Sequence, residues 1–384
     1  MQFTKATLSD LPEFHVGHAN NEEAATGCTV VVSLEGAACS VDVRGGGPAT
    51  RETDLLKPEN MVEAVHAVVL SGGSAFGLEA STGVMQELAK RNIGFELCGL
   101  HVPIVVGACL FDLPYGKPEH PTAKMGAQAT RSALDDAAIA EGNVGAGCGA
   151  TVGKMLDPAQ ATKSGLGIYG VRCGDVVTVA IVAVNALGTV CLPDGTPLAG
   201  HRSIKDSVNG TLMNPLDPVL LSMSPDNSGS ASSESTTVST DAASTSQQEG
   251  CTTPCTNTTI GVVLTNAKLT KAQCQKVSSI THDAYARTIK PVHTSADGDT
   301  IFTMASGKQE AAFDLVAIMA TEAMQGAILR AAALAHSACG LPAAQDLNPE
   351  LCKQVLDQWQ YAPDCNAELS PLSSWRRTGI QITT

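Results

Sequence analysis

The feature that most constrains this fold is a set of short apolar segments rich in strand-forming residues, several of which are apolar almost throughout. They lie at 28–33, 37–43, 65–71, 176–185, 260–266 and 300–304. A strand with one face in water would alternate apolar and polar residues, so uninterrupted apolar runs indicate strands buried on both faces. The chain therefore needs stacked layers that cover both faces of its sheets.

Segments with helical periodicity lie between these strands and can supply the covering layers. Ala80, Val84 and Leu88 recur every four residues and mark one face of a helix. A second helix is predicted to follow Thr270, because Thr270 and Gln273 have the spacing of a capping box. The mixture of strands and helices predicts an α/β or α+β protein with layered sheets.

Charge and hydropathy exclude several classes of partner. The most apolar helical stretch, 311–335, carries Asp314, Glu322 and Arg330 at spread positions. A membrane-spanning helix would not readily tolerate these charges, so a buried core helix is expected. The net charge is −14, and the longest basic cluster is Arg376-Arg377. Neither nucleic acid nor a membrane is therefore an expected partner.

Motifs for metals, cofactors and secretion are weak or broken. The 13 cysteines contain no CxxC pair and no zinc-site spacing, and the segment 293–299 lacks an EF-hand pattern. The glycine-rich run 145–155 has Cys148 where a phosphate loop needs its first glycine. We therefore predict no metal and no cofactor. The first residues, MQFTKATLSDLPEF, lack the apolar core of a secretory signal, so a cytoplasmic location is expected.

The composition of the chain changes abruptly near residue 257. Residues 222–250 are rich in Ser, Thr and Ala, lack aromatic and basic residues, and are predicted to form a disordered loop inserted into one domain. An apolar strand begins within a few residues of Asn257-Thr258-Thr259. Such an arrangement suits a backbone cut, with a flexible segment before the bond and a rigid strand after it.

A cut before Thr258 would also solve a chemical problem. A threonine hydroxyl is a weak nucleophile, and no general base is obvious beside Thr258 in the sequence. Cleavage of the preceding peptide bond would release an α-amine that can act as its base. An α-amine has a pKa of about 7.7–8.0, which lets it accept the hydroxyl proton near neutral pH.

Six motifs in order along the chain point to a known family. They are VDVRGGGPATRETDLL (41–56), LSGGSAFGLEASTGVMQEL (70–88), PIVVGACLFDL (103–113), GNVGAGCGATVGK (142–154), NTTIGVVLTNAKL (257–269) and PVHTSADGDTIF (291–302). Together they resemble the self-processing L-aminopeptidase/D-amidase-esterase family, which includes β-peptidyl aminopeptidases and the nylon-oligomer hydrolase. The resemblance covers about residues 8–335. It implies a four-layer α/β/β/α sandwich related to the ornithine acetyltransferase fold.

The resemblance also implies where the chain is cut. It places self-cleavage between Asn257 and Thr258 in a single hydrolase domain, residues 1–337, followed by a C-terminal extension, residues 338–384. The two fragments are expected to stay together, and homo-oligomers are expected because family members form them. Alternation along a strand directs Thr258 and Thr259 to opposite faces, and the family's Asn-Thr-Thr pattern selects Thr258.

Four further residues receive catalytic roles from the resemblance. Lys154 matches an active-site lysine that favours the neutral amine of Thr258. Asn185 matches an asparagine that donates to the oxyanion. Asp297 and Asp299 match two carboxylates that orient the amine and relay protons. Each residue also has an ordinary structural interpretation: Lys154 as a solvated loop residue, Asn185 as a turn former at the end of a strand, and Asp297-Gly298-Asp299 as a turn. Their combination with Thr258 favours the catalytic roles.

The main hypothesis is therefore an amide hydrolase that acts on small peptides or peptide-like amides through an acyl-Thr258 intermediate. β-Peptidyl aminopeptidases carry Ser and Glu in place of Asp297 and Asp299, so the resemblance does not settle aminopeptidase specificity. One alternative is an acyltransferase of the ornithine acetyltransferase type, in which an amine intercepts the acyl-threonine. Another is a binding protein that keeps the fold but is never cut.

Overall fold

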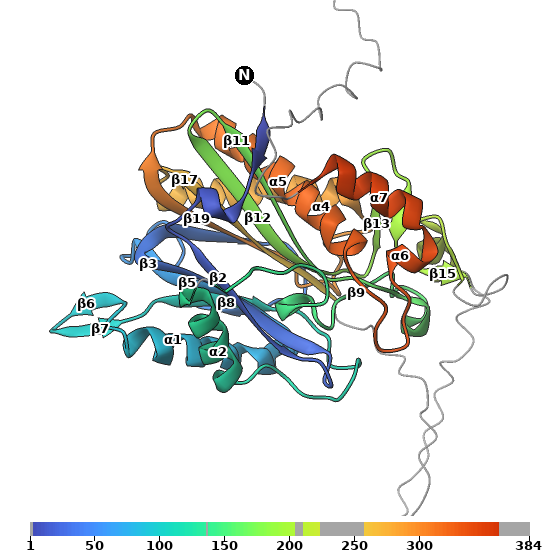
Figure 1. The fold of residues 1–384 in the computed structure, drawn as a ribbon, viewed down its shortest axis with the longest axis horizontal. Helices are drawn as coiled ribbons and strands as arrows, with labels where there is room; N and C mark the ends of the chain where they lie inside the picture. Colours follow the sequence, from blue (N-terminus) through green and yellow to red (C-terminus); the bar gives the residue numbers. More distant parts are fainter. Residues whose placement is uncertain (1–2, 136, 204–209, 223–256, 361–384) are drawn as a thin grey trace, which may run out of the picture.

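The protein is described here by a computed structural model that covers residues 3–135, 137–203, 210–222 and 257–360 (Figure 1). Ten strands of these residues form one continuous hydrogen-bonded sheet: β1 Thr4–Ala6, β2 His15–Asn21, β3 Thr26–Val43, β4 Ala49–Arg51, β5 Ala64–Ser71, β8 Val105–Cys109, β11 Leu166–Cys173, β12 Val176–Asn185, β17 Thr258–Ala267 and β19 Thr300–Gln309. Their order is β1-β11-β12-β17-β19-β3-β5-β8-β4, and β2 pairs with β3. The β17–β19 and β5–β8 pairs are parallel and the other pairs antiparallel.

The remaining elements are shorter strands and the helices. The long helices are α1 Glu79–Ala89, α2 Ala123–Leu134, α4 Lys271–Thr288 and α5 Phe313–Ala333, and the shorter ones are α3 Asp217–Ser222, α6 Ala344–Leu347 and α7 Pro349–Gln358. Small sheets pair β6 Phe95–Leu97 with β7 Leu100–Val102, β9 Thr151–Val152 with β10 Thr162–Lys163, β15 Arg202–Ser203 with β16 Thr211–Leu212, and β13 Thr189–Cys191 with β14 Pro197–Ala199 and β18 Ile289–Lys290.

Strand β3 joins the two halves of the large sheet. The runs 28–33 and 37–43, predicted as separate strands, form this one strand of 18 residues. Its first part pairs with β2 and β5, and its second part pairs with β19. The pairing is irregular between Val32 and Ala37, where Gly36 has a φ of +77° that suits a bulge. The bulge explains why the sequence reads as two strands.

The side chains of the sheet enter three separate cores, and these cores define the layers. On β12, Val182 belongs to a core shared with α4 and α5, whereas its neighbour Ile181 belongs to a core shared with Val68 and Leu70 of β5. On the other face of β5, Val69 packs in a third core with α1 and α2. Two helix pairs thus enclose two half-sheets, which confirms the predicted four-layer α/β/β/α sandwich (Figure 1).

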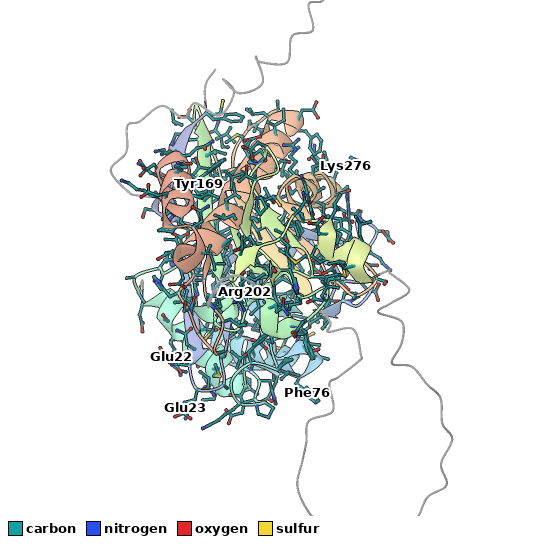
Figure 2. The ribbon with its side chains drawn as sticks, turned by 90° about the vertical axis from the view of Figure 1, so that its right-hand side faces the viewer. Glu22, Glu23, Phe76, Tyr169, Arg202 and Lys276 are labelled. Atoms are coloured by element: carbon teal, nitrogen blue, oxygen red, sulfur yellow. The ribbon has the colours of Figure 1, made fainter. Side chains whose placement is uncertain are left out.

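The sequence predicted the buried faces of the elements because burial on both sides leaves a clear pattern. All ten residues of β12 are buried. On α4, Cys274 and Val277 face the core, whereas Lys276 is exposed and lies at the outer edge of the molecule (Figure 2). The predicted capping box is present, since Thr270 and Gln273 exchange hydrogen bonds at 2.8 and 3.2 Å.

Helix α5 is the predicted core helix. It is long and apolar enough to cross a membrane by length and composition, but 83% of its most apolar window is buried inside the fold. Residues beyond 338 pack against it: Trp359 is 5% exposed, and its carbonyl accepts a hydrogen bond from Arg330 at 2.6 Å. Trp375 and almost all of the predicted loop 222–250 lie outside the described residues.

Candidate active site

Two candidate residues that lie far apart in the sequence are neighbours in the large sheet. Thr258 is the first residue of β17 and pairs directly with Asn185, the last residue of β12. Strand alternation places both on the face that carries Ile260 and Ala183 into the core between the half-sheets. Thr258 is 3% exposed and Asn185 is fully buried. The candidate site therefore lies at one end of the inter-sheet core.

The peptide carbonyl before Thr258 is contacted by two hydrogen-bond donors. The oxygen of Asn257 accepts the backbone N–H of Gly298 at 2.7 Å and the hydroxyl of Thr258 at 2.5 Å. The N–H of Asn257 donates to the carbonyl of Ala296 at 2.8 Å, so this residue is held on both sides. A backbone N–H aimed at a carbonyl oxygen stabilises negative charge that develops there. The bond between 257 and 258 thus lies beside a hydroxyl and an oxyanion donor.

Asp299 anchors the strand immediately after the candidate nucleophile. Its Oδ1 accepts the backbone N–H of Thr259 at 2.8 Å. Its Oδ2 accepts Nδ1 of His293 at 2.8 Å and the backbone N–H of His293 at 3.2 Å. The carboxylate is 1% exposed. These donors offset the cost of removing a carboxylate from water.

Asp297 lies on the other side of Gly298 and has different partners. Its Oδ2 accepts the N–H and hydroxyl of Thr294 at 2.9 and 2.6 Å, and its Oδ1 accepts the N–H of Leu187 at 3.4 Å. Burial and the charge of Asp299 raise the pKa of Asp297, and these donors lower it in part. The environment of Asp297 therefore opposes its ionisation.

Lys154 and Asn185 form a buried pair next to Thr258. Nζ of Lys154 donates to Oδ1 of Asn185 at 2.7 Å and to the carbonyls of Asn185 and Thr151 at 3.0 Å. Oδ1 of Asn185 also accepts the N–H of Thr151 at 3.0 Å, so donors identify this atom as the oxygen of the amide. Nδ2 of Asn185 donates to the carbonyl of Phe111 at 2.9 Å. The second hydrogen of Nδ2 remains available for an oxyanion.

The glycine-rich run reaches the site because its backbone is tied to the segment after β12. The N–H groups of Gly153 and Lys154 donate to the carbonyls of Gly188 and Leu187 at 2.9 and 3.0 Å. Leu187 in turn donates to Asp297, so one short segment links the lysine to the carboxylate pair. The five residues selected from the sequence thus lie in one connected network around Thr258.

Sequence reasoning missed Lys163, which supports the same run from beneath. Its fully buried ammonium donates to the carbonyls of Gly147, Ala150 and Ser164 at distances of 2.5 to 3.1 Å. Burial lowers the pKa of Lys163 to about 8. No spacing in the sequence distinguishes this lysine from a surface residue.

Sequence reasoning also missed an aromatic cluster behind Asp299. The hydroxyl of Tyr285 donates to the carbonyl of Thr259 at 3.4 Å, and burial raises the pKa of Tyr285 well above its usual range. His282, on the same helix, donates through Nε2 to the carbonyl of Asp42 at 3.1 Å, and burial lowers the pKa of His282 to about 4. The residues from α4 that face the site are therefore neutral near pH 7.

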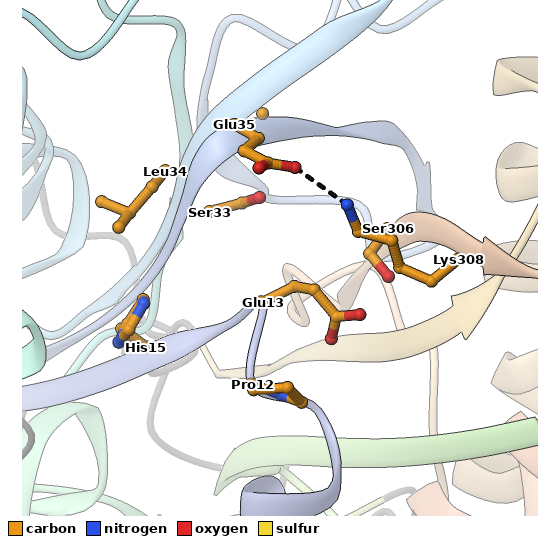
Figure 3. Close-up of a pocket in the computed structure, with 9 residues that line it drawn as sticks. Pro12, Glu13, His15, Ser33, Leu34, Glu35, Ser306 and Lys308 are labelled. Carbon is orange, nitrogen blue, oxygen red and sulfur yellow. Dashed lines mark hydrogen bonds and ion pairs between the residues drawn. The ribbon is translucent and has the colours of Figure 1, made fainter.

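Two cavities away from this network share Pro12 and His15 in their linings. One, of about 240 Å³, contains the ion pair of Glu35 and Lys308 at 2.9 Å (Figure 3). The other has a volume of about 540 Å³ and a lining that includes Phe14. None of the five candidate catalytic residues lines either cavity.

Comparison with known proteins identifies the family. The sequence pattern of peptidase family S58 matches residues 6–344. An uncharacterized aminopeptidase of Mycobacterium leprae (strain TN) is 37% identical over 321 residues, covering 79% of this chain and 80% of the relative. A 6-aminohexanoate-oligomer endohydrolase of Agromyces sp. (strain KY5R) is 28% identical over 299 residues, covering 77% of this chain and 73% of the relative.

Solved structures show the same fold at low sequence identity. A beta-aminopeptidase of Burkholderia sp. has a TM-score of 0.61 at 15% identity, and the match covers 94% of this chain and 96% of that one. An L-aminopeptidase D-Ala-esterase/amidase of Ochrobactrum anthropi, a variant of the Ntn hydrolase fold, has a TM-score of 0.57 at 15% identity, with coverages of 90% and 92%. The chain belongs to peptidase family S58 and is a hydrolase with an Ntn-type fold.

Proposed function

We propose that this chain cuts itself between Asn257 and Thr258 and then hydrolyses peptide or peptide-like amides as an aminopeptidase or amidase. The observation that carries the proposal is the environment of the Asn257 carbonyl. Its oxygen accepts both the N–H of Gly298 and the hydroxyl of Thr258, at 2.7 and 2.5 Å. This arrangement supports the proposal, because the hydroxyl that would attack and a backbone N–H that could stabilise the oxyanion both contact this carbonyl.

Self-cleavage follows from this arrangement in two steps. Oγ of Thr258 attacks the carbonyl carbon of Asn257, the C–N bond breaks, and the released α-amine takes the hydroxyl proton. The resulting ester is hydrolysed by one water, which gives a carboxylate on Asn257 and returns the hydroxyl of Thr258. The new α-amine then serves as the base for the same hydroxyl when a substrate amide binds.

The other residues of the network support the turnover reaction. The second hydrogen of Asn185 Nδ2 donates to the oxyanion of the substrate, while Lys154 holds the oxygen of the same amide at 2.7 Å. The cation of Lys154 also favours the neutral form of the α-amine. Asp297 relays protons, since burial and its anionic neighbour raise its pKa.

The substrate class is inferred from relatives. The protein from Mycobacterium leprae is named an aminopeptidase, and the protein from Agromyces is named for oligomers of 6-aminohexanoate. Both names describe amide bonds between amino-acid-like units. We therefore propose small peptides or peptide-like amides as substrates, in a cytoplasmic homo-oligomer.

The proposal is tested on the purified full chain by denaturing electrophoresis and intact-mass measurement. We expect two fragments, the second beginning at Thr258, and one intact chain for Thr258→Ala. Thr259→Ala is the matched control, because that side chain faces the opposite side of β17 and should leave cleavage intact. A wild-type chain that stays whole after long incubation would refute self-cleavage. Release of free acid from an amino-acid anilide or a 6-aminohexanoate oligomer then tests turnover.

A further inference from the structure

The side chain of His293 donates a hydrogen bond to Asp299. Nδ1 of His293 lies 2.8 Å from Oδ2 of Asp299, and the backbone N–H of the same residue reaches the same oxygen at 3.2 Å. An ionised carboxylate only accepts hydrogen bonds, so Nδ1 carries the proton. The Nε2 atom is buried and has no hydrogen-bond partner in the described part of the chain. The ring therefore acts on the site through Nδ1.

The backbone of His293 is shaped to direct both donors to one oxygen atom. Its φ is +56°, in the left-handed region that residues other than glycine seldom adopt. Histidine and asparagine are among the side chains that enter this region most readily. Unusual backbone conformations persist where the surrounding structure requires them, and they are common at functional sites.

The ring of His293 is also held in place by two rings of α4. Tyr285 stacks on it, with ring centroids 6.0 Å apart and an interplanar angle of 28°. His282 meets it edge-on, with centroids 4.8 Å apart and an angle of 73°. The imidazole is 19% exposed, so it retains some contact with solvent. These contacts limit its rotation and keep Nδ1 directed at the carboxylate.

We propose that His293 is a positioning residue, whose Nδ1–H holds the carboxylate of Asp299 in the orientation that accepts the amide N–H of Thr259. This inference rests on the proposed function. Through Asp299, the histidine fixes the peptide that follows Thr258, while Gly298 fixes the peptide that precedes it. It also separates the roles of the two carboxylates. Asp299 holds the peptide that follows Thr258, and Asp297 is the carboxylate that exchanges protons.

The other charged and titratable groups near His293 are consistent with this division. Tyr285 and His282 face the ring from α4, and burial keeps both neutral near pH 7 by raising the pKa of Tyr285 and lowering that of His282 to about 4. From β3, Asp42 accepts Nε2 of His282 through its carbonyl, and Asp42 is paired with Arg44 at 2.9 Å. The two α4 side chains that pack against the ring of His293 are therefore not cations near pH 7.

Two substitutions that both tolerate a positive φ separate the hydrogen bond from the ring. His293→Asn keeps an N–H donor close to the position of Nδ1, whereas His293→Gly removes the donor, and both variants lose the ring. Self-cleavage, kcat, KM and Tm are measured on the full chain. We expect His293→Gly to lower kcat about 10- to 100-fold with little change in KM, and His293→Asn to stay within about threefold of wild type.

The pH profile of kcat/KM supplies a second readout. Only His293→Asn keeps a side-chain donor to the Asp299 carboxylate, so we expect its profile to follow that of wild type and the profile of His293→Gly to differ from it. Equal kcat values and equal profiles for the two variants, whether both high or both low, would overturn the inference. If the two variants behave alike but the wild-type chain is cut before Thr258 and hydrolyses substrate, the proposed function still stands. An uncut, inactive wild type would instead refute the proposed function.

Discussion

Gly298→Ala should slow self-cleavage because there is no room for a side chain at this position. A Cβ atom on Gly298 would lie 2.7 Å from Oγ1 of Thr258 and 2.8 Å from the carbonyl oxygen of Gly47. Ordinary contact begins at 3.4 Å, so Oγ1 would have to move by about 0.7 Å. The Gly47 carbonyl belongs to the backbone and cannot move away as a flexible side chain would.

The size of the effect follows from this displacement. Misplacing a reacting atom by about 1 Å can cost about 100-fold in rate, so we expect cleavage to slow by about 10- to 100-fold. The assay is a time course of intact and cut chain on denaturing gels after synthesis, with the new terminus identified by mass. Gly47→Ala is the matched control, because its Cβ would meet only one atom, at 3.8 Å, and should leave the rate unchanged.

The result that would refute this reasoning is a Gly298→Ala chain that is cut at the wild-type rate before Thr258. It would mean that a methyl group next to the hydroxyl of Thr258 does not disturb the geometry of attack. Equal slowing in Gly47→Ala would also count against it, because that substitution adds the same methyl group without the same close contacts.

Three further predictions concern buried ionisable side chains. Lys154→Met should lower kcat about 10- to 100-fold with KM little changed, because Asn185 loses a charge-assisted hydrogen bond; steady-state kinetics that match wild type would exclude this role. Lys163→Met should destabilise the fold by about 2 kcal/mol or more in urea unfolding, since three carbonyls lose their donor, and an unchanged midpoint would contradict it. The third prediction is made in a Thr258→Ala background. The pKa of His282 is about 4 in the folded state against 6.5 in the unfolded state, so between these pH values the unfolded state binds the proton more readily and acidification favours unfolding. His282→Gln should reduce the loss of stability over this pH range by up to about 3 kcal/mol, and an equal loss in both proteins would show that His282 does not titrate there.

The layered arrangement could be predicted from the sequence, because strands buried on both faces are apolar throughout. This pattern is visible without knowing which segments pack against them. The run 176–185 is apolar throughout, and all of β12 is buried. The helix N-cap at Thr270 could also be predicted, because both of its hydrogen bonds join residues close together in the sequence. The division of β3 was read wrongly, because the exposed Glu35 and the bulge at Gly36 have the composition of a turn between strands.

The candidate catalytic residues were named from ordered motifs, but the sequence could not show how they meet. The register of β12 against β17 sets Asn185 opposite Thr258, and a shift by one residue would turn either side chain to the other face. Likewise, the backbone ties of Lys154 to Leu187 depend on contacts between separate segments.

By itself, the sequence determined the layered fold, the family and the bond at which cleavage is proposed, because apolar periodicity and ordered motifs are properties of the chain alone. Only the tertiary structure decided that His293 donates to Asp299, that Lys163 lies under the glycine-rich run, and that Gly298 donates to the carbonyl of Asn257. The physical reason is that a buried polar group takes its role from its hydrogen-bond partners. Those partners come from distant segments that only the packed sheets bring together.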